Sequence, residues 1–259
     1  MTHITEEISV SGRNAQLTIY LPDLPHKKRP LVIICPGGGY DHVSEREGEP
    51  AALMFCAAGI NAAVLRYSVS PAHYPQQINE LAYAHSLLIE NADRYDIDKR
   101  HIFLCGFSAG AHLAASYALT GKDNIPAGNI PAGMILCYPV ITSGVYAHRG
   151  SFEALLGDKC TDSTLLEKLS LEKQVTQNTP PAFIWHTASD RTVPVENSLL
   201  FASALKNQGI DFELHIFPSG DHGMALANEI TAKPGKDYIR PECAVWTELA
   251  LTWIKNICD

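Results

Sequence analysis

Six short, mostly apolar runs recur along the chain, and they constrain its fold more than any other feature. They span residues 31–35, 61–67, 101–105, 133–138, 182–186 and 212–217. Strands made of consecutive apolar residues are covered on both faces, as in a parallel sheet. Between these runs lie stretches with helical spacing of apolar residues, of which residues 76–93 are the clearest. This alternation predicts a doubly wound α/β fold.

Two segments depart from the alternation. The first twenty residues alternate weakly between polar and apolar and predict an antiparallel hairpin or a pair of edge strands. Residues 142–180 contain short helical and polar pieces, which we expect to form a small cap-like insertion over one end of the sheet. We therefore predict one domain over residues 1–259, with a mostly parallel sheet of about eight strands and helices on both faces.

Charge and cysteine content exclude several classes of partner and compartment. The formal net charge of −8 argues against a nucleic-acid or anionic-membrane surface. The N-terminus lacks the pattern of a signal peptide, and no apolar run reaches membrane length. The seven cysteines form no C-x-x-C pair and are expected to be free thiols, which indicates a cytoplasmic protein. The oligomeric state stays open, with a homodimer through the final helix or the N-terminal strands as one expectation.

The stretch Gly106-Phe107-Ser108-Ala109-Gly110 lies between a buried strand and a helix and matches G-x-S-x-G. A strand that reverses sharply into a helix holds its central residue in a strained conformation, with the hydroxyl above the sheet edge. Residues two positions away must be very small, because the helix and the adjoining strands pass close by. The pattern therefore predicts Ser108 as a nucleophile.

A serine nucleophile needs a base and an acid that orients this base, in the chain order Ser, acid, His. Asp190 follows the run 182–186, and His222 follows the run 212–217, so both are expected at strand ends on the sheet edge of Ser108. The competing His112 is expected to point along its helix and to pack, and His186 is expected to be a core histidine. The sequence therefore predicts a Ser108-His222-Asp190 triad.

Three glycines follow the run 31–35 and allow the backbone to turn its N–H groups toward a point above Ser108. We expect an oxyanion hole from the amides of Gly38, Gly39 and Ala109, the last at a helix N-terminus. No phosphate-binding glycine motif and no paired metal-ligand spacing of histidines occurs, so we expect neither a metal nor a cofactor.

Four further residues lie at or near strand ends and are candidates for a substrate pocket. They are Tyr40, Arg46, Tyr67 and Tyr138. For each of them, packing beneath the loops is an equally good interpretation.

At this point the chain resembles the esterase and lipase branch of the α/β-hydrolase superfamily. The resemblance rests on G-F-S-A-G, on the P-G-G-G-Y turn and on the late Asp190 and His222. Closer still, SEREGEP (44–50), LRYS (65–68) and TPPAFIWH (179–186) resemble bacterial acetyl esterases and acetyl-xylan esterases. Two positions depart from these families: Pro36 stands where the lipase-type branch has histidine, and Ala111 where closer relatives have glycine.

The resemblance implies serine-dependent hydrolysis of short acyl esters, with acetylated carbohydrates as the expected substrates. The short insertion at 142–180 also favours small acyl groups. Four alternatives stay open: a peptidase of the same fold, a thioesterase, a lactonase, and a non-catalytic binding module. Such peptidases usually carry a large extra domain, for which a chain of 259 residues leaves no room, and binding modules normally lose a triad member.

Overall fold

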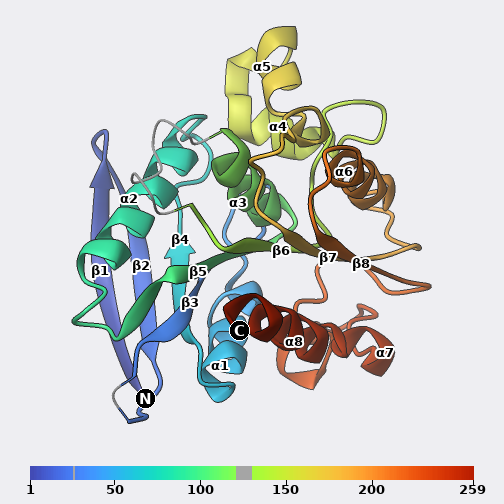
Figure 1. Ribbon diagram of the computed structural model, residues 1–259. Coiled ribbons are helices and arrows are strands. Elements are labelled where there is room, and N and C mark those ends of the chain that lie inside the picture. Colours follow the sequence, from blue (N-terminus) through green and yellow to red (C-terminus); the bar gives the residue numbers. More distant parts are fainter. Residues whose placement is uncertain (26, 121–129) are drawn as a thin grey trace.

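Eight strands form one sheet in the order β1-β2-β4-β3-β5-β6-β7-β8 in the computed structural model, which describes residues 1–25, 27–120 and 130–259 (Figure 1). The strands are β1 (Thr2–Val10), β2 (Arg13–Leu21), β3 (Arg29–Cys35), β4 (Asn61–Arg66), β5 (Ile97–Phe107), β6 (Gly133–Cys137), β7 (Ala182–Thr187) and β8 (Phe212–Phe217). The first two are antiparallel to their neighbours, and the remaining pairs are parallel. The mostly parallel sheet and the N-terminal hairpin are thereby confirmed.

Helices cover both faces of the sheet (Figure 1). One face carries α2 (Gln76–Glu90), α3 (Ala109–Thr120) and α6 (Glu196–Asn207), and the other carries α1 (Glu49–Ala57), α7 (Pro241–Ala244) and α8 (Trp246–Cys258).

Alternate residues of the central strands divide between the two helical layers. In β3, Leu31 and Ile33 join the core under α2 and α3, whereas Val32 and Ile34 join the core with α1 and α8. All four are fully buried, and burial of one such side chain contributes about 1.5–3 kcal/mol. The continuous apolar runs therefore form strands that are covered on both faces.

The segment 142–180 is an insertion of short helical pieces on the side of α3 and α6 (Figure 1). It contains α4 (Arg149–Leu156), η3 (Gly157–Lys159), α5 (Ser163–Lys168) and η4 (Leu171–Lys173). Phe152, Leu155 and Leu171 are buried and belong to the same core as α3. Apolar side chains of the insertion therefore pack into the core of the domain. Two further short turns, η1 (Glu45–Glu47) and η5 (Glu229–Thr231), lie in loops beyond the strands.

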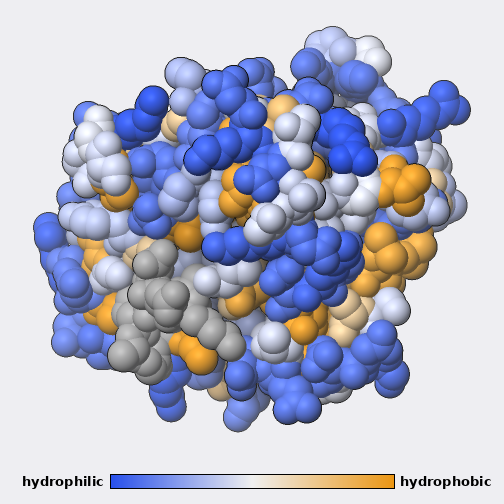
Figure 2. Space-filling model, turned by 90° about the horizontal axis from the view of Figure 1, so that it is seen from above, coloured by the Kyte–Doolittle hydropathy of each residue, from blue (hydrophilic) through white to orange (hydrophobic). Residues whose placement is uncertain are grey.

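Hydrophilic residues dominate the surface seen from above, and hydrophobic ones interrupt it only in small patches (Figure 2). Within the described ranges, none of the helices is both long and apolar enough to cross a membrane. All seven cysteines are free thiols, as expected from their spacing.

Candidate active site

Ser108 lies at a sharp turn between β5 and α3, in the left-handed region with φ 53°. Its amide donates to the carbonyl of Cys137, which ties the turn to the neighbouring strand β6. A Cβ atom on Gly106 would lie 2.4 Å from Ala111 Cα, and one on Gly110 would lie 2.0 Å from the carbonyl oxygen of Cys35. Only glycine fits at either position, because the atoms in the way belong to the backbone. This crowding is the reason for the G-x-S-x-G pattern.

We expect Gly110→Ala to lower the free energy of unfolding by about 3 kcal/mol or more, because the new methyl group would press into strand β3. Chemical denaturation followed by circular dichroism measures the change. Gly150→Ala is the matched control, since its Cβ would meet only Cε1 of His148, the N-cap residue of α4, at 3.7 Å, which is an ordinary contact. Equal stability of the two variants would contradict the steric account of the turn.

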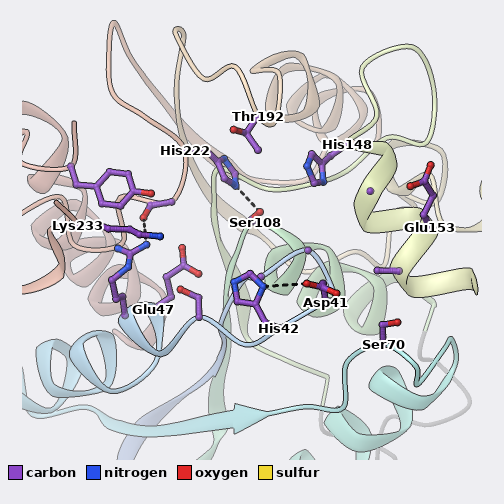
Figure 3. A pocket seen from close by; sticks show the side chains of 18 residues that line it. Asp41, His42, Glu47, Ser70, Ser108, His148, Glu153, Thr192, His222 and Lys233 are labelled. Atoms are coloured by element: carbon purple, nitrogen blue, oxygen red, sulfur yellow. Dashed lines mark hydrogen bonds and ion pairs between the residues drawn. The ribbon is translucent and has the colours of Figure 1, made fainter. Parts of the chain in front are cut away.

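His222 joins Ser108 and Asp190 in a hydrogen-bonded chain. Figure 3 shows the bond between His222 and Ser108. Its Nε2 lies 2.7 Å from Ser108 Oγ, and its Nδ1 lies 2.6 Å from Asp190 Oδ2. The three residues follow β5, β7 and β8 and meet beyond the carboxyl ends of these strands. The arrangement requires that Nδ1 donates to the carboxylate and that Nε2 accepts the serine proton. The structure therefore brings together all three residues that the sequence singled out.

Both oxygens of Asp190 accept hydrogen bonds. Oδ1 accepts from the amides of Thr192 (2.8 Å) and Val193 (2.9 Å), and Oδ2 accepts from His222 and, at 3.2 Å, from Nε2 of His186. Burial alone would raise the pKa of Asp190, but the hydrogen bonds from His186 and His222 outweigh it and hold that pKa well below its usual range. Asp190 therefore stays ionised at neutral pH.

His186 is fully buried, as predicted for a core histidine, but one of its partners is the acid of the triad. Its Nε2 also donates to the carbonyl of Val193 at 3.0 Å, and its Nδ1 accepts from the hydroxyl of Ser198 at 2.8 Å. The sequence placed His186 in the core but held no sign of this contact with Asp190.

The glycine turn after β3 lies against Ser108. A Cβ on Gly37 would be 3.1 Å from Ser108 Cβ, and one on Gly38 would be 1.9 Å from the carbonyl oxygen of His42. Gly38 and Gly39 both have positive φ, at 125° and 65°, and both line the cavity that holds Ser108. Ala109 follows Ser108 as the first residue of α3. The three predicted oxyanion-hole residues thus surround the serine, and their role as donors stays a prediction.

Of the four predicted pocket residues, only Arg46 lines the cavity. Tyr40, Tyr67 and Tyr138 are at most 2% exposed, so these three follow the alternative interpretation, packing beneath the loops. Each hydroxyl has a buried partner instead: Tyr40 bonds His112 Nδ1 at 2.9 Å, Tyr67 donates to Pro36 O at 2.6 Å, and Tyr138 donates to Glu47 Oε1 at 2.7 Å. Through these hydrogen bonds the tyrosines pack beneath the loops that surround the cavity.

His112 packs beneath the glycine turn, as expected for a residue that does not act as the base. Burial lowers its pKa to about 4, partly opposed by a hydrogen bond to the carbonyl of Leu169. The neutral imidazole accepts from Tyr40 and donates to Leu169, and so links the turn to the insertion.

The cavity above Ser108 has a volume of about 640 Å³ (Figure 3). Apart from Ala154 and the glycines, every lining residue is polar. The sequence did not single out the following lining residues: Asp41, His42, Ser44, Glu47, Ser70, His148, Gly150, Glu153, Ala154, Thr192, Gly223, Lys233 and Tyr238. Most of these residues stand in loops or in the insertion, where no periodic pattern marks an orientation. In the described part of the chain, no three His, Cys, Asp or Glu residues are grouped so that they could hold a metal ion.

Sequence comparisons match two family models. The prolyl oligopeptidase family matches residues 77–233, and BD-FAE matches residues 17–133. An endo-1,4-beta-xylanase B of Butyrivibrio fibrisolvens is 44% identical over 78% of this chain and 33% of its own length. An acetylxylan esterase of Xylanibacter ruminicola is 30% identical over 86% of this chain and 46% of its own. The chain thus spans between a third and a half of the length of these two curated relatives.

Comparison of structures gives full-length neighbours as well. The crystal structure of an acetyl ester-xyloside bifunctional hydrolase from Caldicellulosiruptor lactoaceticus superposes with a TM-score of 0.84. It is 39% identical and covers 95% of this chain and 89% of its own. The chain therefore belongs to the α/β-hydrolase superfamily, where it matches the prolyl oligopeptidase family over residues 77–233 and lies on the esterase branch.

Proposed function

We propose that this protein is a serine carboxylic-ester hydrolase that removes short acyl groups, above all acetyl, from carbohydrates. The observation that carries the proposal is the hydrogen-bonded chain from Ser108 Oγ through His222 to Asp190. Two of its relatives, the acetylxylan esterase and the acetyl ester-xyloside hydrolase, bear names that fit this activity.

In the first half of the reaction, Ser108 Oγ attacks the ester carbonyl carbon while its proton passes to His222 Nε2. Asp190 accepts from Nδ1, fixes the tautomer of the imidazole and stabilises the imidazolium. The carbonyl oxygen becomes an oxyanion. The backbone amides of Ala109, Gly38 and Gly39 stabilise this oxyanion by hydrogen bonds. Loss of one such donor typically raises the barrier by about 3 kcal/mol.

Collapse of this intermediate breaks the bond to the alcohol oxygen, which leaves with the proton from His222. Ser108 now carries the acyl group. Water then gives a proton to His222 and attacks the acyl carbon, and the second intermediate releases the carboxylic acid as Ser108 recovers its proton. The atoms of one ester and one water thereby become one alcohol and one acid.

The polar lining of the cavity supports a small acyl group and a polar alcohol. A long acyl chain needs apolar walls, since each buried methylene contributes about 0.8 kcal/mol only where water is excluded from it. Here the walls carry charged side chains from two loops and from helix α4, namely Asp41, Lys233 and Glu153. Such groups can exchange hydrogen bonds with the hydroxyls of a sugar.

We expect p-nitrophenyl acetate to be hydrolysed at least about tenfold faster than the decanoate, because the polar cavity offers the longer chain little apolar burial. A panel of p-nitrophenyl esters from acetate to decanoate measures the preference for acyl-chain length. Acetate release from an acetylated xylo-oligosaccharide tests whether the alcohol part of the substrate can be a carbohydrate. Faster turnover of the decanoate would refute the short-chain assignment.

The match to the prolyl oligopeptidase family favours a peptidase as the second candidate. Peptidyl p-nitroanilides belong in the same panel for this reason. Turnover of the anilides without turnover of any ester would replace the esterase proposal, and silence of all substrates would favour a binding module.

A further inference from the structure

Glu47 is a buried carboxylate beneath the catalytic residues, and the mechanism above does not use it. Its residue is 3% exposed, and it forms no ion pair with any residue in the described part of the chain. Burial of a carboxylate is costly unless hydrogen bonds replace its water. The hydrogen bonds that Glu47 accepts must therefore offset the cost of burying its carboxylate.

One oxygen of Glu47 holds the glycine turn. Oε2 accepts from the amide of Gly37 at 2.8 Å, and a Cβ on Gly37 would lie only 2.7 Å from this oxygen. Gly37 directly precedes Gly38 and Gly39, whose amides face the oxyanion in the proposed reaction. The carboxylate therefore fixes the first peptide of the turn from below.

The other oxygen of Glu47 reaches the loop of His222 through Tyr138. Oε1 accepts from the Tyr138 hydroxyl at 2.7 Å, and the same hydroxyl accepts from the amide of Ala225 at 2.9 Å. The ring of Tyr138 also lies edge-on to the imidazole of His222, with 5.0 Å between the ring centroids. Tyr138 thus touches both the base and the chain that follows it.

Arg46, the neighbour of Glu47 in η1, binds the same loop from the other side. Its guanidinium donates to the carbonyls of Gly223 (3.0 Å) and Thr231 (2.7 Å). One short turn of 3-10 helix therefore contacts the glycine turn and the His222 loop at once, although these segments are far apart in the sequence.

We propose that Glu47 is a positioning residue that aligns the oxyanion turn through Gly37 and the base His222 through Tyr138. This inference rests on the proposed esterase function. It assigns a role to a residue that touches neither the reacting carbon nor the serine, and it explains why Tyr138 is buried rather than exposed in the cavity.

The test compares Glu47→Gln and Tyr138→Phe with Glu45→Gln. Glu45 stands in the same turn but is exposed and pairs with Arg66, so its loss should leave activity unchanged. In Glu47→Gln the amide can accept from Gly37 but leaves the Tyr138 hydroxyl without an acceptor. We expect kcat per active site to fall by about tenfold to a hundredfold, a fraction of the effect of losing an oxyanion donor, with KM changed less than about threefold.

Three readouts separate positioning from a structural role. Titration with a fluorophosphonate counts the sites that carry a reactive Ser108, so that misfolded protein does not lower the apparent kcat. Affinity for a trifluoromethyl ketone, which forms a tetrahedral adduct with the serine, should weaken by the same factor as kcat/KM. The double variant Glu47→Gln/Tyr138→Phe should lose less than the product of the single losses, because both act through one contact.

Each outcome decides between the two proposals. If Glu47→Gln keeps the kcat and the ketone affinity of the wild type, the positioning role is wrong while the esterase function stands. If the wild type hydrolyses no ester, the proposed function fails. The role of Glu47 can then still be tested by the affinity of Glu47→Gln for the ketone, with Ser108→Ala as the variant that cannot form the adduct. Should Glu47→Gln fail to fold, Tyr138→Phe takes its place, and wild-type values for that variant would overturn the link to His222.

Discussion

Replacement of Ser108 by alanine is expected to lower kcat by about 10⁴- to 10⁶-fold, because His222 and Asp190 then have no nucleophile to activate. The remaining catalysis would come from binding and from the oxyanion hole, with water as the attacking group. Steady-state hydrolysis of p-nitrophenyl acetate measures the change. Fluorophosphonate labelling must vanish in parallel, which separates a true loss of the nucleophile from loss of substrate binding.

The fold should survive this substitution. The hydroxyl of Ser108 makes one hydrogen bond to His222, and its removal costs only about 1 kcal/mol of stability. Ser116→Ala is the matched control, since it removes a buried hydroxyl from α3, the helix that follows Ser108, away from the cavity. A Ser108→Ala enzyme that kept more than a few per cent of the activity would refute the assignment of the nucleophile.

Asp190→Asn is expected to lower kcat by about 10⁴-fold, because the amide no longer fixes the tautomer in which Nε2 of His222 accepts a proton. The same kinetics on p-nitrophenyl acetate measure it. Asp221→Asn is the matched control: this carboxylate adjoins His222 in sequence, but its Oδ2 accepts from the amide of Asp237 rather than from the imidazole. A larger loss in Asp221→Asn than in Asp190→Asn would reverse the assignment.

We also expect the stability difference between the wild type and Asp190→Asn to depend on pH. The folded-state pKa of Asp190 lies below its unfolded value, so the ionised carboxylate stabilises the native state above the unfolded pKa of about 4. This contribution is lost as the pH falls from there toward the folded value. The difference in free energy of unfolding between the wild type and Asp190→Asn should therefore narrow below about pH 4, as denaturant titrations at several pH values would show.

The position of the triad could be predicted from sequence because it depends on strand ends. Ser108, Asp190 and His222 each follow a buried apolar run, and the topology of a doubly wound sheet brings such positions together. The extent of β5 was harder to predict. After the buried Ile97 come polar residues, of which Lys99 and Arg100 are exposed, yet the strand begins at Ile97 because this residue pairs with Arg29 of β3.

The orientation of single side chains could not be predicted in this way. Tyr40, Tyr67 and Tyr138 stand at or near strand ends like the triad, but each turns into the core, where a buried partner takes its hydroxyl. Glu47 shows the converse: the sequence marked its stretch, SEREGEP (44–50), only as a family resemblance, and only the fold reveals that Glu47 is buried. The hydrogen bonds of the three tyrosine hydroxyls, one of them to Glu47, join residues between 31 and 91 positions apart.

The insertion at 142–180 lines part of the cavity but contains none of Ser108, Asp190 and His222. It supplies His148, Gly150 and Glu153 to the cavity wall, whereas the proposed nucleophile, acid and base all lie just beyond strands of the sheet. A change in this segment would therefore alter one wall of the cavity and leave Ser108, Asp190 and His222 in place. The same separation gives protein engineers a module for exchange between relatives, provided that Phe152, Leu155 and Leu171, or equivalents, remain to anchor it in the core.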